Sequence, residues 1–89
     1  GLTALWVAVI EQAVFDAGLP PSEMPKGKSA ASKWLALQKD KKAARKWLSG
    51  RTKDLWSVLE AAQINPTMFW KAQPMFEKRW ADIDAGLAG

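Results

Sequence analysis

Apolar side chains recur every three or four residues at the start of the chain, which is the spacing of one face of an α-helix. Over residues 2–17 these apolar positions widen to almost the whole circumference, and polar positions such as Glu11 and Asp16 are few. A helix with so wide an apolar surface is typical of a buried one, so we expect residues 1–17 to form the central helix. Gly18 predicts the end of this helix, and the proline-rich segment 18–28 is expected to be a loop.

The middle of the chain contains two similar six-residue segments. Ser29 is a candidate N-cap for a helix that starts at residue 30. The segment AASKWL at 30–35 is similar to AARKWL at 43–48. On one straight helix this offset of 13 residues is a rotation of about 220° beyond three turns, so Trp34 and Trp47 would point to nearly opposite sides. A pair of core-facing tryptophans favours a break, although no residue here forbids one long helix. The prediction is two helices, 30–38 and 41–48, with Asp40 as the N-cap of the second.

The last third of the chain has signals for short helices. Asp54 is a candidate N-cap for a helix over 55–63. Asn65-Pro66 combines a good N-cap with proline at the first helical position and predicts a helix over 66–73. Pro74 should end or kink that helix, because its ring blocks the backbone bond to the carbonyl four residues back.

Residues 75–84 look helical again, and no segment has the alternating pattern of a strand. We therefore predict an all-α fold, a compact bundle of four to six short helices in a single domain over 1–89. The expected parts are a central helix at 1–17, a loop at 18–28, basic helices at 29–53 and a helix-turn-helix-like segment at 54–84.

Composition excludes several kinds of chemistry. The 89 residues include neither Cys nor His, which removes disulfides, thiol nucleophiles, the usual zinc sites and histidine acid–base catalysis. The acids are scattered and no glycine-rich phosphate loop is present. We expect a non-enzymatic protein with no cofactor, no metal site and no small-molecule substrate. No Lys or Arg precedes Lys26, and the uncharged stretches are too short for a membrane span, so a cytoplasmic location is expected.

Charge is concentrated in the middle third. The net charge is +4, but residues 26–53 carry ten Lys or Arg against Asp40 alone, while both ends are mildly acidic. Such a block favours a polyanionic partner, although a solvated helix face has the same composition. The candidate phosphate contacts are Lys41, Lys42, Arg45, Lys46, Arg51 and Lys53.

Residues 54–73 have the spacing of a helix-turn-helix. Counting Leu59 as motif position five places the turn at Gln63 and apolar residues at Ile64 and Phe69. The turn position usually has positive φ, where glycine is favoured, so the motif is degenerate, and a packed helix pair in a bundle has the same pattern. As a recognition helix, the second helix would enter the major groove of DNA. The residues expected to face the duplex are Thr67, Trp70, Lys71 and Gln73.

The six tryptophans are spread at about one per expected helix, which favours a role in core packing. Trp56 and Trp70 lie off the main apolar stripes. These two could instead stack on bases, insert into a groove of a partner or lie at a membrane interface.

AARKWL at 43–48, followed by KDLWSVLEAAQINP at 53–66, resembles a group of small uncharacterised phage and prophage proteins. Their pattern is roughly Ala-Ala-Arg-x-Trp-Leu, a short Gly/Ser loop, then Arg-Asp-Phe-x-x-Val-Cys-x-x-Ala-Gly-Leu-Asp-Pro. The opening LWVAVIEQAVFDA at 5–17 is similar to the first helix of that group, and the similarity skips 18–42. The group has no settled activity, so the resemblance implies a phage origin and, for a phage-encoded protein, the host cytoplasm.

These observations predict a small phage-type accessory protein that binds DNA through a basic face. One alternative is an inhibitor or adaptor that binds an acidic surface of a host or virion protein. A second alternative is a membrane-active, bacteriocin-like helical protein, since Trp and Lys fit that class. The choice between DNA and RNA, the target sequence and the oligomeric state stay open.

Overall fold

The computed structural model describes residues 1–86, and over these residues the chain forms four α-helices and no strand. The all-α prediction is therefore confirmed for the described part, and residues 87–89 of the predicted domain lie outside it. The helices are α1 (Leu2–Ala17), α2 (Lys28–Ser49), α3 (Lys53–Ala61) and α4 (Pro66–Asp84).

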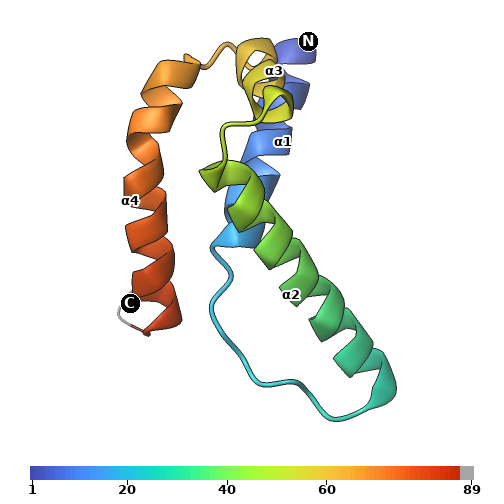
Figure 1. The fold of residues 1–89 in the computed structure, drawn as a ribbon. Helices are drawn as coiled ribbons and strands as arrows, with labels where there is room; N and C mark the ends of the chain where they lie inside the picture. Colours follow the sequence, from blue (N-terminus) through green and yellow to red (C-terminus); the bar gives the residue numbers. More distant parts are fainter. Residues whose placement is uncertain (87–89) are drawn as a thin grey trace.

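Helix α1 packs along the C-terminal half of α2 and also contacts α3, while α4 returns on the other side of the molecule (Figure 1). The radius of gyration is 14.6 Å, compared with about 12 Å for a compact domain of this length. The first turns of α2 and the loop before it project from the body, and the buried residues of α2 all lie in its second half. The molecule accordingly extends over 43 × 28 × 21 Å.

The core lies where the end of α2 meets α1 and α3. Its largest fully buried side chains are Leu48, Leu55 and Leu59. Phe69 and Trp80 add the contribution of α4. Burying a leucine of this kind contributes about 2 kcal/mol, so these three leucines supply a large part of the folding free energy.

The expectation that α1 is the central, most buried helix is wrong. Only Ile10 and Ala17 of this helix are buried, whereas Leu2 is 76% and Phe15 is 66% exposed. The reason is the position of α4, which packs against α2 and α3 and leaves the outer side of α1 uncovered. Among the described helices, none combines the length and apolar character that a bilayer span requires.

The prediction of two helices over 30–38 and 41–48 is also wrong, because α2 runs without a break through Lys39 and Asp40. Trp34 and Trp47 point to different sides of α2, as one continuous helix requires, and each has its own hydrogen-bond partner. Trp34 donates from Nε1 to Ser22 Oγ in the preceding loop at 2.9 Å. Trp47 donates to Asp54 Oδ2 at 2.8 Å. No core-facing pair exists, so no break is needed.

Two predicted N-caps are replaced by neighbouring residues. Helix α2 begins after Gly27, whose φ is 102°, and not after Ser29. Thr52 and not Asp54 caps α3, because its hydroxyl accepts from the Leu55 N–H at 3.1 Å. The cap at Asn65 is confirmed: its side-chain oxygen accepts from the Thr67 N–H at 2.9 Å.

Pro74 does not end a helix, since α4 continues through it to Asp84. Phe69, Gln73, Phe76 and Trp80 are spaced i, i+4, i+7 and i+11 and therefore fall within about 60° of one another on the helix surface. Their packing on both sides of the proline offsets the roughly 3 kcal/mol that proline costs inside a helix. Pro74 itself is exposed.

Candidate nucleic-acid interface

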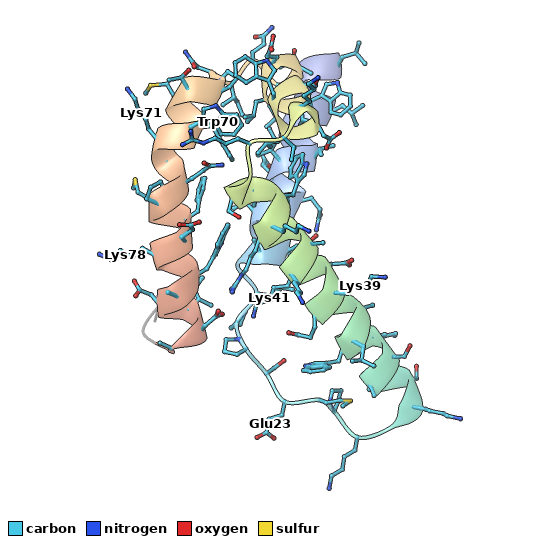
Figure 2. All side chains as sticks on the ribbon, in the orientation of Figure 1. Glu23, Lys39, Lys41, Trp70, Lys71 and Lys78 are labelled. Carbon is cyan, nitrogen blue, oxygen red and sulfur yellow. The ribbon has the colours of Figure 1, made fainter. Side chains whose placement is uncertain are left out.

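The basic residues of α2 divide between two faces of the helix. Lys39, Lys42 and Lys46 are exposed and lie within about 60° of one another, over roughly 10 Å of helix length. We call these three residues the lysine stripe. Ion pairs within residues 1–86 involve Lys41, Arg45 and Asp84, so the stripe is not neutralised by an acid there. Figure 2 shows Lys39 and Lys41 on opposite sides of α2.

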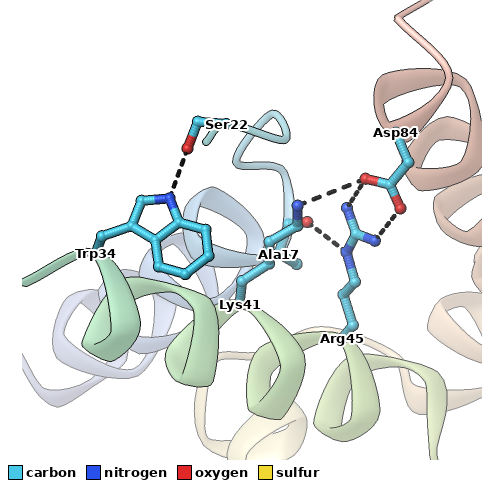
Figure 3. Close-up of polar contacts among 6 residues, drawn as sticks. All are labelled: Ala17, Ser22, Trp34, Lys41, Arg45 and Asp84. Atoms are coloured by element: carbon cyan, nitrogen blue, oxygen red, sulfur yellow. Dashed lines mark hydrogen bonds and ion pairs between the residues drawn. The ribbon is translucent and has the colours of Figure 1, made fainter. Parts of the chain in front are cut away.

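Arg45 is on the face of α2 that packs against α1 and α4 (Figure 3). Its Nε donates to the Ala17 carbonyl at the end of α1 at 2.8 Å. Its Nη1 and Nη2 donate to the two carboxylate oxygens of Asp84 on α4, at 2.6 and 2.9 Å. The guanidinium also lies 5.6 Å from the centre of the Trp80 ring. One side chain therefore ties three helices together.

Lys41 shares this internal role. Its side chain is 11% exposed, and Nζ lies 3.5 Å from Asp84 Oδ1. Hydrogen bonds from Arg45 are the largest cause that holds the pKa of Asp84 below its ordinary value, and the positive charges of Arg45 and Lys41 act in the same direction, while desolvation opposes them. Lys41 and Arg45 are thus engaged with Asp84 on α4, and their role as phosphate contacts stays a prediction.

Gln73 is likewise internal and not on a surface that could face a duplex. It is 6% exposed, and its Nε2 donates to the carbonyls of Leu48 at 3.0 Å and Gly50 at 2.7 Å. These bonds satisfy carbonyl groups at the end of α2 that have no partner within the helix. Its Oε1 accepts from Arg51 Nε at 3.5 Å, so Gln73 also orients Arg51.

The remaining predicted residues are at the surface but in two separate places. Arg51 and Lys53 are exposed and follow the end of α2, so they continue the chain from the lysine stripe into α3. Thr67 and Lys71 are exposed on α4. In Figure 2, Lys71 points away from the rest of the molecule, in the same direction as Lys78. These four residues therefore come from two elements of the chain, the connection into α3 and the first turns of α4.

The turn between α3 and α4 has the backbone conformation that the helix-turn-helix spacing requires at its ninth position. Gln63 has a φ of 60°, the one positive φ at a residue other than glycine within 1–86. Its N–H donates to the Glu60 carbonyl at 3.0 Å, and the Ile64 N–H donates to the Leu59 carbonyl at 2.8 Å. This is a Schellman motif, which ends helices in many folds and is not specific to DNA-binding proteins.

Trp56 and Trp70, the tryptophan pair, lie at this end of the molecule. Their ring centres are 6.3 Å apart with planes inclined by 42°. Trp56 is 44% exposed and Trp70 is half-buried, whereas Trp80 is buried. The expectation that these two tryptophans differ from the core residues holds for Trp56, because a ring this exposed does little to fill the core.

A shallow apolar groove of about 470 Å³ runs between α1 and α2 and is lined mainly by small and apolar residues, together with Asp16 and Asp40. No group of His, Cys or acidic residues within 1–86 has the geometry to hold a metal ion. The lysine stripe and the tryptophan pair therefore remain the surface features with defined chemistry.

Lys39 is the surface residue that sequence reasoning missed. Its spacing of i, i+3 and i+7 with Lys42 and Lys46 indicates that the three lysines share one helix face. This pattern appears only when residues 39–46 belong to one helix. The expected break at Lys39–Asp40 removed Lys39 from the basic face.

Comparison of the chain with protein-family models, with curated proteins and with solved structures finds no match. The geometry of its own residues is thus the basis for a functional proposal.

Proposed function

We propose that this chain is a small, non-enzymatic accessory protein of phage type that binds nucleic acid through the lysine stripe. The observation that carries the proposal is the exposure of Lys39, Lys42 and Lys46 on one face of α2 with no ion-pair partner among residues 1–86. Arg51 and Lys53 extend this positive surface beyond the end of the helix.

The physical basis is release of counterions. A lysine that neutralises a phosphate releases a condensed cation, so the logarithm of affinity falls with the logarithm of salt by about 0.9 per phosphate on duplex DNA. A helix presents its three ammonium groups on a backbone that is already formed, so no loop has to be ordered first, which lowers the entropic cost of binding. Such contacts hold a phosphate backbone and carry no sequence information by themselves.

The test compares two variants that lose the same charge. The first replaces the lysine stripe (Lys39→Gln, Lys42→Gln, Lys46→Gln) and the second replaces three exposed residues elsewhere (Lys33→Gln, Lys78→Gln, Arg79→Gln). Both lower the formal net charge from +4 by three units to +1. Arg45 and Lys41 stay intact in both because they hold α4.

Fluorescence anisotropy with a labelled random duplex at several salt concentrations gives the affinity and its salt slope. We expect the stripe variant to lose about tenfold or more in affinity and roughly three units of salt slope, and the matched variant to lose far less. Equal losses in the two variants would show that binding follows net charge and would reject the stripe. No binding by the unchanged protein at low salt would reject nucleic acid as the partner.

A separate variant tests the helix-turn-helix mode. Thr67→Ala with Lys71→Ala removes exposed polar groups from the first turns of α4, which would enter the major groove in that mode. A loss of affinity for one sequence over others would assign α4 as a recognition helix. Unchanged affinity on all duplexes leaves the lysine stripe as the contact surface and the turn at Gln63 as a helix-pair connection.

The alternative function is that of an inhibitor or adaptor that binds an acidic protein surface. It is favoured by the exposed apolar side chains of α1, including Leu2, Leu5 and Phe15, since protein partners commonly cover such residues. A partner retained in a pull-down after nuclease treatment, and lost from the stripe variant but not from its matched control, would support this function.

A further inference from the structure

We infer that the tryptophan pair is a stacking site for an unpaired nucleobase, so that the preferred ligand is single-stranded nucleic acid. The inference rests on the proposed function and adds a ligand class to it. The observation is the grouping of two indoles and one guanidinium at the α3–α4 end: Trp56 and Trp70 have ring centres 6.3 Å apart, and Arg51 Cζ lies 5.8 Å from the centre of the Trp70 ring.

The exposed member of the pair is the one with space for a base. Trp56 is 44% exposed, and its neighbour Trp70 is half-buried. Figure 2 shows Trp70 directed from α4 toward α3, and thus toward the helix that carries Trp56. An indole supported on one side and open on the other provides the flat apolar surface on which a base stacks.

The site is held in place by its neighbours. Trp70 packs edge-on against Phe69 with ring centres 5.9 Å apart, and Phe69 is buried. Arg51 contacts Gln73, whose amide is anchored on the Leu48 and Gly50 carbonyls. Rings and guanidinium are therefore largely in position before a ligand arrives, which reduces the ordering cost of binding.

The surrounding charge favours a phosphate-linked ligand. Lys53 lies one turn before Trp56 on α3, and both are exposed. Asp54 is engaged by the Trp47 indole N–H, while Glu60, one turn after Trp56, is the acid that remains on this face of α3. Arg51 and Lys53 follow Lys46, the last residue of the lysine stripe, by five and seven residues along the chain. Arg51 and Lys53 thus place two cations beside the aromatic surface, where they can hold the phosphates that flank a stacked base.

A base inside a duplex is stacked on its neighbours and presents no free face, whereas every base of a single strand does. Stacking on Trp56 therefore predicts a preference for single strands that phosphate contacts do not provide. The stacking contribution of one base corresponds to roughly five- to hundred-fold in affinity.

The experiment measures binding of a labelled 12-nucleotide thymidine oligomer and of a labelled 12-base-pair duplex in parallel. The variants are Trp56→Leu, which removes the ring, and Trp56→Phe, which keeps an aromatic face. Phe15→Leu is the control, because it removes another exposed aromatic ring, from α1 and far along the chain from the site. Thermal unfolding of each variant checks that the fold is kept.

We expect Trp56→Leu to weaken binding of the single strand by about tenfold while leaving duplex binding unchanged. Trp56→Phe should retain most of the affinity, and Phe15→Leu all of it. In the unchanged protein, the thymidine oligomer should quench tryptophan emission, and this quenching should be reduced in Trp56→Leu, which gives a readout that does not depend on affinity alone.

The two proposals fail in distinguishable ways. Salt-dependent binding by the unchanged protein, with equal affinity for both probes and no effect of Trp56→Leu, overturns the stacking site and keeps the lysine stripe. Absence of binding to either probe at low salt overturns both proposals. A protein that is pulled down by the unchanged chain after nuclease treatment, but not by Trp56→Leu, would show that the tryptophan pair is a protein interface.

Discussion

Lys42 and Arg45 are three residues apart on one helix, yet their environments differ completely. Lys42 is exposed, whereas the guanidinium of Arg45 bonds a carboxylate on α4 and a carbonyl at the end of α1. Because two parallel bonds to a carboxylate and a third to a carbonyl use the planar fork of arginine, lysine is not an equivalent replacement at position 45.

We expect Arg45→Lys to lower the free energy of unfolding by about 1–2 kcal/mol, since it loses hydrogen bonds to a charged partner. Lys42→Met, a change on the exposed face, should shift it by less than about 0.5 kcal/mol. Urea denaturation followed by circular dichroism measures both. Equal effects at the two positions would mean that Arg45 does not tie the helices together in solution.

The contact between Arg45 and Asp84 makes the free energy of unfolding depend on pH. The pKa of Asp84 is held below the ordinary value of 3.8, mainly by the hydrogen bonds from Arg45. A lowered pKa in the folded state contributes stability that is complete above the unfolded pKa and is lost as the pH falls through the folded one. The carboxylate is 44% exposed, so solvent screening makes the effect small.

We therefore expect Asp84→Asn to be less stable than the unchanged protein at pH 7, with the difference shrinking as the pH falls below about 4. Urea unfolding of both proteins at pH 7, 5 and 3 measures this convergence. A stability difference that is the same at all three values would show that the ion pair is not the source.

At the scale of elements, α4 contains a proline that its packing tolerates. Pro74 is exposed, and the apolar stripe of α4 continues on both sides of it. Pro74→Ala restores a backbone N–H and removes a clash with the preceding turn, so it should raise the free energy of unfolding by about 1–3 kcal/mol. Chemical denaturation measures the gain, with Ala81→Gly, also exposed on α4, as a control expected to lower stability by about 1 kcal/mol.

Besides Pro74, the turn before α4 contains a second residue in an unfavourable backbone conformation. Gln63 has a φ of 60°, where side chains with a Cβ are disfavoured and glycine is not. Gln63→Gly should stabilise the protein by up to about 1 kcal/mol, because relief of strain exceeds the added entropy of the unfolded chain. A lower melting temperature for this variant would contradict the left-handed conformation.

The elements differ in how far the sequence could specify them. Asn65 followed by Pro66 and the stop at Gly18 are local signals, and both predictions are confirmed. Continuity through Asp40 and Pro74 depends on contacts made elsewhere: Trp34 on the loop, and Phe76 and Trp80 on the far side of the proline. Such tertiary contacts cannot be read from propensity or spacing.

The candidate site shows the same division. Exposure of Lys42 and Lys46 follows from helical spacing, but the burial of Gln73 does not. Its amide meets the carbonyls at the end of α2, 23 and 25 residues away along the chain, and no local pattern encodes that meeting. Lys39 was missed because an incorrect break separated it from its neighbours on the helix.

At the scale of the whole molecule, packing is uneven along α2. Its buried residues are Lys41, Ala44 and Leu48, while its first half projects with Leu35 and Leu37 about half exposed. A helix segment without a buried face opens at a low free energy, because its amides are protected by little beyond local hydrogen bonds. The lysine stripe begins at Lys39, near the boundary between the two halves.

Native-state hydrogen exchange should therefore show fast exchange over 30–38 and slow exchange over 43–48. If the lysine stripe binds nucleic acid, adding duplex at low salt should slow exchange around Lys39 and Lys42 more than around Lys71 on α4, because phosphates hold the bound helix closed. A matched run with the stripe variant should show no such slowing. Uniform protection along α2 in the free protein would contradict the uneven packing, whereas slowing centred on α4 would move the contact surface to that helix.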